Sequence, residues 1–123
     1  MYISPLDHRV RVAALVTFIC SISKKVEARV EDAESDPEQD IQGLLGAGID
    51  HTEEVGMIAP RPVSIGAATR DFFPIEGTRK TFQELQQLYT KLGFPERVKM
   101  VEFVHEHKYS QPLREATYGR FDR

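Results

Sequence analysis

The sequence has 123 residues but only one cysteine, no tryptophan and no long apolar segment. A single cysteine cannot form an internal disulfide, so nothing points to a small secreted scaffold held by crosslinks. The longest apolar run, residues 12–22, is shorter than the about 20 residues that span a bilayer. It follows Asp7 and His8 and lacks a small-residue cleavage site, which argues against a signal peptide. We therefore expect a cytoplasmic protein without a membrane segment.

A strong charge of either sign is also missing. The chain has 16 basic and 19 acidic residues, a net charge of −3, and no basic stripe that would favour nucleic-acid binding. No motif for a metal or another cofactor stands out, so we expect none. What is present is an ordinary globular composition, 41% hydrophobic and 28% charged. This composition and length predict a single domain over residues 1–123.

Three segments have the pattern of strands. Residues 12–19 are apolar apart from Thr17, as expected for a parallel strand buried between helices. Residues 62–69 form a second candidate, whose small side chains would let a helix approach closely. Residues 98–104 alternate in part, which predicts a third strand near a sheet edge.

Helical patterns separate these strands. The clearest covers residues 78–92, with apolar side chains three and four positions apart. Asp50 and Glu53 have the spacing of a capping box, opening a short helix that Pro60 would stop. Ser110 and Pro112 are expected to open a last helix.

The region between the first two strands is less regular. The polar residues 24–39 predict either an exposed acidic connection or a solvated helix. A short helix is expected from Pro37 to Leu45, ended by Gly46 and Gly48. The alternation of strands and helices predicts the α/β class: a three-layer, open, mostly parallel sheet of about three strands with flanking helices.

Titratable residues follow the second and third strands, at the sheet edge where open α/β folds place their working groups. Asp71 comes after the second strand, and His105 and His107 come after the third. An acid followed by a histidine matches the end of a Ser, Asp, His triad, in which a carboxylate orients and stabilises the base. Plainer interpretations remain open, because Asp71 can simply begin a turn and His107 can lie on the surface.

Other residues in these loops have competing interpretations. His105 is an alternative base, and the two histidines together are a weak candidate for a metal pair. Cys20 fits a buried structural cysteine better than a nucleophile. Phe72 and Phe73 are expected to pack against the following helix, although aromatic rings beside the acid can also contact a substrate.

Two motifs give the sequence a family resemblance. Residues 69–73 read Thr-Arg-Asp-Phe-Phe and residues 106–110 read Glu-His-Lys-Tyr-Ser. In this order, and with DIQGLLGAGIDH upstream, the sequence resembles the C-terminal part of bacterial α/β-hydrolases of the acetyl xylan esterase type, which are serine esterases. The resemblance implies a truncated α/β-hydrolase fold acting on a small ester, with Asp71 as the triad acid and His107 as the base.

The nucleophile motif of that family is absent. None of the six serines lies in a Gly-x-Ser-x-Gly sequence, and the nearest, Ser64, falls inside the second predicted strand. In the family this motif lies upstream of the region represented here, so we expect negligible esterase activity from the chain alone. The alternatives are a non-catalytic binding or oligomerising protein, or half of an enzyme completed by a second chain. We expect a homo-oligomer or a partner that supplies the rest of the fold, but no nucleic acid and no membrane.

Overall fold

A parallel sheet of three strands forms the centre of the computed structural model, which describes residues 2–29 and 41–121. Strand β1 covers Ala13–Val16, β2 covers Val63–Ala68 and β3 covers Val98–Phe103. The order is β1-β2-β3, with both pairs parallel, so β2 is central. The predicted α/β class, with an open parallel sheet of three strands, is confirmed, and so is the edge position of the third strand.

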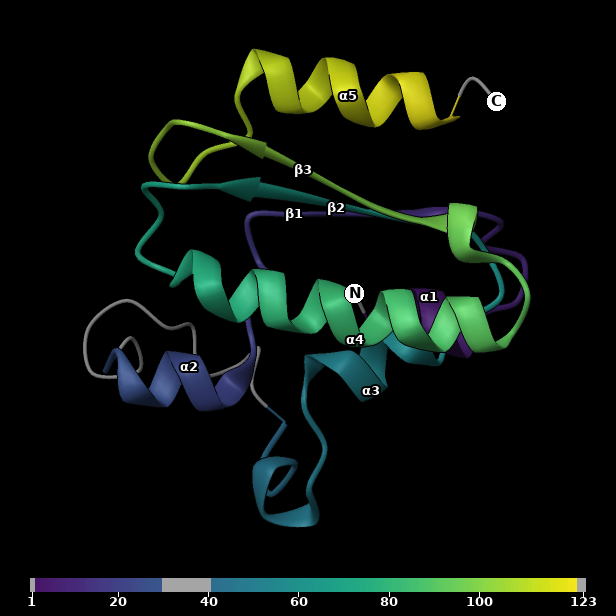
Figure 1. Cartoon of the computed structure of the whole chain (residues 1–123), viewed down its shortest axis with the longest axis horizontal. Helices are drawn as coiled ribbons and strands as arrows, with labels where there is room; N and C mark the ends of the chain where they lie inside the picture. Colours follow the sequence, from purple (N-terminus) through teal and green to yellow (C-terminus); the bar gives the residue numbers. More distant parts are fainter. Residues whose placement is uncertain (1, 30–40, 122–123) are drawn as a thin grey trace.

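Helices cover both faces of this sheet (Figure 1). Helix α5, Gln111–Phe121, lies over one face, and α4, Ile75–Lys91, lies over the other. The short helices α2, Ile22–Glu27, and α3, His51–Gly56, lie on the side of α4. The three-layer arrangement follows from the apolar pattern of the strands, which need cover on both faces.

The first strand is shorter than the sequence predicts. Residues 17–19 of the expected strand leave the sheet because Thr17 has φ 53°, a left-handed conformation that is unusual for a β-branched residue. The Thr17 hydroxyl donates to the Val16 carbonyl at 2.8 Å. Ile19 and Cys20 are nevertheless buried, because the Thr78 hydroxyl of α4 donates to the Ile19 carbonyl at 2.6 Å and holds this loop under the helix.

The burial of the central strand, β2, accounts for the small side chains in its sequence. Every residue of β2 is buried. A Cβ atom on Gly66 would lie 3.0 Å from the Leu113 side chain of α5 and 3.2 Å from Val16. The close approach of α5 to the sheet, predicted from the small side chains, therefore depends on this glycine.

Helix α4 supplies the main cover of the core. It begins three residues before the predicted range of 78–92, directly after Pro74, whose fixed φ suits a helix start. Leu85 and Tyr89 are fully buried against the sheet. The Tyr89 hydroxyl donates to the Arg61 carbonyl at 2.7 Å, and burial raises the pKa of Tyr89 to about 12.

The predicted capping box is confirmed at the start of α3. The Asp50 side chain accepts a backbone N–H of the first turn, and the Glu53 carboxylate accepts the Asp50 N–H at 2.8 Å. Two donors at the helix start are satisfied by this exchange. The helix ends at Gly56, before Pro60 as expected.

The region between β1 and α3 differs from its prediction in one respect. Of the polar residues 24–39, the first four belong to α2, and Lys25 is 2% exposed rather than solvated. Its ammonium group lies over the ring of Phe73, 5.4 Å from the ring centre, so this ring covers the charged end of the side chain. Residues 30–40, which include Pro37, lie outside the described residues.

The remaining short elements are 3-10 helices and one N-terminal turn. Helix α1 covers Ile3–Leu6, and the 3-10 helices η3 and η4 cover Leu45–Ala47 and Pro95–Arg97. The helix expected from Pro37 to Leu45 is wrong over its described part, because residues 41–44 are not helical and the 3-10 helix begins only at Leu45. Of the two predicted stops, Gly46 lies inside η3 and Gly48 ends it, at φ 73°. Arg61 holds the N-terminal segment, because its guanidinium donates to the carbonyls of Ser4, Asp7 and Val10.

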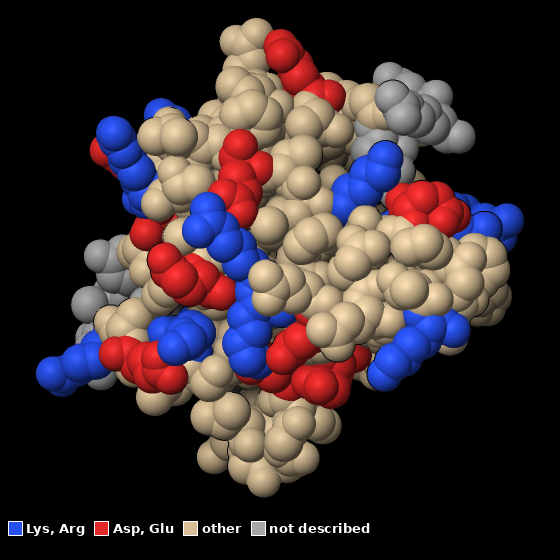
Figure 2. Space-filling view, viewed as in Figure 1, with Lys and Arg blue, Asp and Glu red and all other residues tan. Residues whose placement is uncertain are grey.

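Charges of both signs are interspersed on the surface of the face shown in Figure 2. Some of the surface charges form ion pairs, such as Arg79 with Glu102 at 2.6 Å. Within the described ranges, no helix combines the length and the apolar character needed to cross a membrane.

Candidate active site

The loop after β2 buries the predicted acid. The Asp71 side chain is 4% exposed, and its Oδ1 accepts the Phe73 N–H at 3.1 Å. An aspartate that bonds the backbone two residues ahead stabilises its own turn. The plainer interpretation of Asp71 as a turn residue is therefore correct, but one oxygen contact does not exhaust the capacity of a carboxylate.

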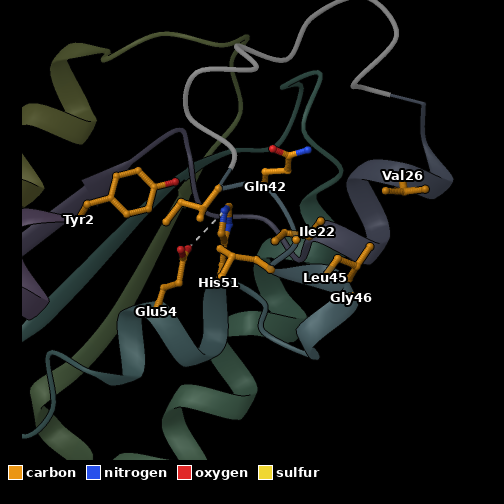
Figure 3. Close-up of a pocket in the computed structure, with 11 residues that line it drawn as sticks. Tyr2, Ile22, Val26, Gln42, Leu45, Gly46, His51 and Glu54 are labelled. Carbon is orange, nitrogen blue, oxygen red and sulfur yellow. Dashed lines mark ion pairs between the residues drawn. The ribbon is translucent and has the colours of Figure 1, made fainter.

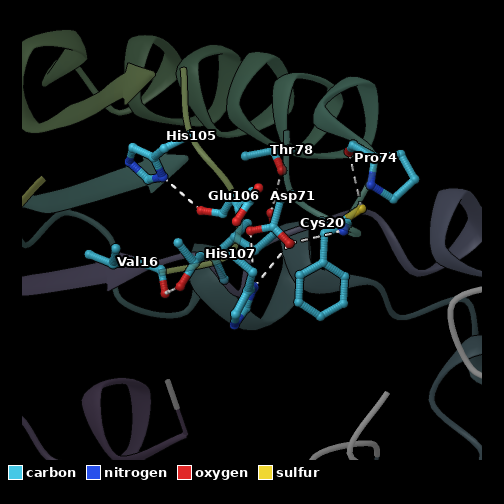
Figure 4. Close-up of polar contacts among 11 residues, drawn as sticks. Val16, Cys20, Asp71, Pro74, Thr78, His105, Glu106 and His107 are labelled. Carbon is cyan, nitrogen blue, oxygen red and sulfur yellow. Dashed lines mark hydrogen bonds and ion pairs between the residues drawn. The ribbon is translucent and has the colours of Figure 1, made fainter. Parts of the chain in front are cut away.

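The loop after β3 brings the predicted base to this carboxylate. His107 Nδ1 lies 2.9 Å from Asp71 Oδ1 and 3.0 Å from Oδ2 (Figure 4). Because a carboxylate only accepts hydrogen bonds, Nδ1 carries the proton, and the neutral imidazole presents Nε2 as an acceptor. Elsewhere in the described chain Nε2 finds no hydrogen-bond partner, and the side chain is 40% exposed. This geometry suits proton transfer at Nε2.

A backbone contact ties the two loops together. The Arg70 N–H donates to the His105 carbonyl at 3.1 Å, directly beyond the last pairing of β2 with β3. The parallel register thus continues into the loops. Asp71 and His107 meet because their strands are neighbours that end at the same edge.

Aromatic rings hold the imidazole from the side. The Phe72 ring stacks on His107, with centroids 4.4 Å apart and an interplanar angle of 24°. Phe73 meets the same imidazole edge-on at 5.8 Å. Phe73 is also buried against Cys20, in the loop after β1, so packing against the following helix stays a prediction, and the contact of Phe72 with the base was missed. No sequence signal distinguishes the two phenylalanines.

The described residues place no nucleophile at His107. The Cys20 thiol is buried and contacts the carbonyls of Ser21 and Pro74, at 3.6 and 3.5 Å. Ser64 is buried in β2, and the hydroxyl of Ser110 is hydrogen-bonded to His105. Ser35 lies outside the described residues. Cys20 is packed rather than presented, as expected for a structural cysteine.

His105 is neither a second base nor a metal ligand in this structure. Its Nδ1 lies 2.7 Å from the Glu106 carbonyl, and its Nε2 lies 2.7 Å from the Ser110 hydroxyl. Both ring nitrogens are therefore engaged. Among the residues described, no group of three His, Cys, Asp or Glu side chains is arranged to hold a metal ion.

Asp50 holds the loop after β1, the third loop at this end of the sheet, through hydrogen bonds. Its carboxylate accepts the N–H groups of Ile22, at 2.8 Å, and His51, at 2.6 Å, and the Ser21 hydroxyl at 3.0 Å. Burial by itself would raise the pKa of Asp50, but these hydrogen bonds outweigh it and hold the pKa below its ordinary value. The loop after β1 is thereby fixed to the start of α3.

A cavity of about 320 Å³ lies beside this loop, between α2, η3 and α3. Its walls include Ile22, Val26 and Leu45, and His51 and Glu54 face it with their side chains 4.0 Å apart (Figure 3). His51 Nδ1 accepts the Cys20 N–H at 3.2 Å, so its Nε2 is the protonated nitrogen when the ring is neutral.

The larger cavity does not contain the acid–base pair. Asp71 lines a small cavity of about 10 Å³, together with Thr17 and Phe73. Phe18 lies between the two regions, with ring centroids 5.3 Å from His51 and 6.5 Å from Phe73. The ring of Phe18 therefore separates the Asp71–His107 pair from the cavity of about 320 Å³.

No protein-family model matches the sequence, and no curated protein does either. Solved structures share its fold. A carbohydrate esterase family 15 glucuronoyl esterase from Caldicellulosiruptor kristjansonii has a TM-score of 0.74 at 16% identity, over 97% of this chain. A glucuronoyl esterase from Solibacter usitatus has a TM-score of 0.65 at 10% identity, over 96% of this chain. The methylesterase BT1017 has a TM-score of 0.51 at 24% identity, over 57% of this chain.

These likenesses concern the fold. The chain has an α/β fold like that of carbohydrate esterases, which agrees with the fold class predicted from the sequence. It spans 37% of the length of each glucuronoyl esterase and 16% of the methylesterase. The acetyl xylan esterase type and the catalytic roles of Asp71 and His107 are tested by none of these comparisons and stay predictions.

Proposed function

We propose that Asp71 and His107 are the acid and base of a carboxylic-ester hydrolase of the acetyl xylan esterase type. The observation that carries the proposal is the contact of His107 Nδ1 with both Asp71 oxygens, at 2.9 and 3.0 Å. The buried carboxylate selects the tautomer and stabilises the imidazolium, while the exposed side of the ring offers Nε2. The likeness of the fold to carbohydrate esterases supports the same class of reaction.

The reaction is an acyl transfer through a serine. The serine oxygen attacks the ester carbonyl, and its proton moves to His107 Nε2. The alcohol leaves with that proton, and water then releases the acid from the acyl-serine by the same relay. Asp71 stabilises the imidazolium during both steps.

We place the serine outside this sequence, because no Gly-x-Ser-x-Gly occurs in it. The outer edge of β1 is the proposed docking site for the strand that carries this serine. Ala13, the first residue of β1, and Thr17, which follows it, direct their N–H groups to the β2 side. The backbone groups of Ala14 and Val16 therefore face the outer edge of the sheet. An added strand would pair there and end at the same sheet edge as His107.

Hydrolysis of 4-nitrophenyl acetate tests the proposal. The isolated chain is expected to show only the background of its four histidines, since imidazole itself attacks this ester. Co-expression with an upstream hydrolase segment that carries Gly-x-Ser-x-Gly is expected to restore turnover. His107→Ala should then lower kcat by about 10³-fold or more, with His8→Ala as the matched control.

Two results would contradict the proposal. Turnover by the completed enzyme that survives His107→Ala and Asp71→Asn would remove these residues from the reaction. Turnover by the isolated chain that exceeds the histidine background and is lost in His107→Ala would instead show that the nucleophile lies within this sequence.

Self-association is the other proposed way to cover β1. No strand among residues 2–29 and 41–121 pairs with its outer edge, and such an edge with apolar residues promotes association, so a second copy of this chain is the alternative partner. Light scattering at micromolar concentration distinguishes the cases. A dimer or larger oligomer supports self-association, and a stable monomer counts against it.

The cavity between α2, η3 and α3 favours a second candidate function, the binding of a small molecule without turnover. Its volume of about 320 Å³ falls at the lower end of the range for ligand pockets. Apolar walls beside His51 and Glu54 suit a compact apolar body that carries a hydroxyl. Cyclohexanol is a simple probe, and chemical-shift changes at residues lining the cavity should disappear in Leu45→Trp, which fills it. Equal shifts in this variant would contradict binding there.

A further inference from the structure

The loop that carries the proposed base is closed by a side chain of its own. His105 lies two residues after the end of β3, and Ser110 directly precedes α5. The contact between His105 Nε2 and the Ser110 hydroxyl, at 2.7 Å, joins the two ends of the loop. We name this contact the loop clamp. His107 lies at the middle of the segment that the clamp encloses.

The clamp has support on both sides. On the strand side, the His105 carbonyl accepts the Arg70 N–H at 3.1 Å, which connects it to the acid loop. On the helix side, the Ser110 carbonyl accepts the Arg114 N–H at 2.9 Å. The two ends that the clamp joins are therefore fixed to the sheet and to α5, whereas the His107 ring between them is 40% exposed.

The protonation of His105 is fixed by the same contacts. The Glu106 carbonyl, 2.7 Å from Nδ1, can only accept, so Nδ1 carries a proton (Figure 4). In the neutral ring, Nε2 then accepts a hydrogen bond from the Ser110 hydroxyl. That hydroxyl proton is therefore directed at His105 and not at His107. His105 thus has the same tautomer as His107 but uses both nitrogens for structure.

We infer that His105 is a positioning residue, which acts through Ser110 to hold His107 against Asp71. Two other hydrogen bonds restrain the loop backbone, and both lie on its C-terminal side: Ser110 N–H donates to the Lys108 carbonyl at 3.0 Å, and the Arg114 guanidinium donates to the Tyr109 carbonyl at 2.9 Å. Removal of the clamp would let the loop move and leave the His107–Asp71 contact made only part of the time. The consequence for catalysis rests on the proposed function, but the effect on His107 does not.

The test measures the His107 ring directly. In the wild-type chain, ¹⁵N spectra of the imidazoles should show His107 with its proton on Nδ1. In Ser110→Ala, His107 should shift toward the Nε2–H tautomer that a free side chain prefers, and its Nδ1 proton should exchange with water about fivefold faster. His105→Gln should give the same change. Ser110→Thr keeps a hydroxyl and is expected to restore the wild-type spectrum.

Controls separate positioning from general destabilisation. Gln111→Ala removes an exposed contact with Glu115 at the neighbouring residue of α5 and should leave His107 unchanged. The amide protons of α5 should keep their protection in Ser110→Ala. An unchanged His107 tautomer and exchange rate in both clamp variants, with the chain folded, would overturn the inference.

The catalytic consequence has its own readout. In the completed enzyme, Ser110→Ala should lower kcat while KM stays near its wild-type value, because the clamp acts on the base and not on the bound ester. If the completed enzyme proves inactive while the clamp variants still shift His107, the proposed function fails and the positioning role of His105 stands.

Discussion

The acid and the base of the candidate site are held in different ways. Asp71 is 4% exposed and lies next to Phe73, which is buried in a small cluster with Cys20. His107 is 40% exposed and lies on a loop whose ends are joined by the loop clamp. The acid is therefore positioned by burial and by its own turn, whereas the base is positioned by its contact with Asp71, by the stacked Phe72 ring and by the loop clamp.

The difference suits the two roles proposed for these residues in proton transfer. A carboxylate that keeps one orientation gains from burial, because fixed groups cost no reorganisation during the reaction. A base that must reach a second reactant needs one exposed side. Substitutions around Asp71 should thus mainly lower the free energy of unfolding. Substitutions around His107 should mainly change the tautomer and orientation of its imidazole, with a smaller loss of stability.

The largest effect is expected at the packed side of the site. Phe73→Ala should lower the free energy of unfolding by about 3 kcal/mol, because it removes a buried ring between Cys20 and the acid loop. Urea denaturation measures this loss. Phe72→Ala, which removes a partly buried ring, serves as the comparison and should cost less. Equal losses would show that burial does not distinguish the two rings.

Asp71→Asn keeps the shape of the acid and changes its hydrogen bonding. The amide oxygen can still accept the Phe73 N–H, but the amide NH₂ would face His107 Nδ1, so the histidine should move its proton to Nε2. We expect a stability loss of about 1–2 kcal/mol together with this change of tautomer. Imidazole ¹⁵N shifts check it, and an unchanged tautomer would contradict the assigned geometry.

Asp50 extends the comparison to the loop after β1. Its pKa is held below the ordinary value of 3.8 in the folded chain, so its ionised form stabilises the fold above that pH, and this contribution is lost as the pH falls through the lower, folded-state value. Asp50→Asn should lower stability by about 1 kcal/mol at pH 7. Unfolding measured from pH 7 to strongly acidic conditions should show this difference shrink below pH 3.8. A difference that grows on acidification would contradict the sign.

The smallest effect on stability is expected at the base itself. His107→Ala removes a ring that is 40% exposed, but it also takes a hydrogen-bond donor from the buried Asp71 carboxylate, so the free energy of unfolding should fall by less than about 1 kcal/mol. The same denaturation series provides the measurement. A loss comparable to that of Phe73→Ala would show that the base loop belongs to the core, and the contrast between the two loops would fail.

Much of the fold follows from patterns that the sequence displays. The period of three and four residues predicts α4, Asp50 and Glu53 mark the start of α3, and the alternation of strands with helices gives the parallel sheet. The same topology implies that Asp71 and His107 share one sheet edge. Their mutual contact was expected for this reason, and the structure brings them within hydrogen-bond distance.

Features that depend on one residue's conformation escaped prediction. The left-handed Thr17 ends β1 early, and nothing in a continuous apolar run signals such a turn. The side chain of Lys25 is buried within a polar stretch because a distant aromatic ring covers it. The loop clamp joins residues five apart, and its geometry exists only after the loop has formed.

Thr17 also affects how the proposed additional strand would bind to the outer edge of β1. Its hydroxyl bonds the Val16 carbonyl, one of the groups that face the outer edge of the sheet. An incoming backbone N–H would share this carbonyl with the hydroxyl, because a carbonyl oxygen has two lone pairs, and it would gain less from that hydrogen bond than from a carbonyl without a partner. Discrimination among competing strands at this position must then come from side-chain fit, and a non-specific extended peptide has less to gain there than at a bare edge.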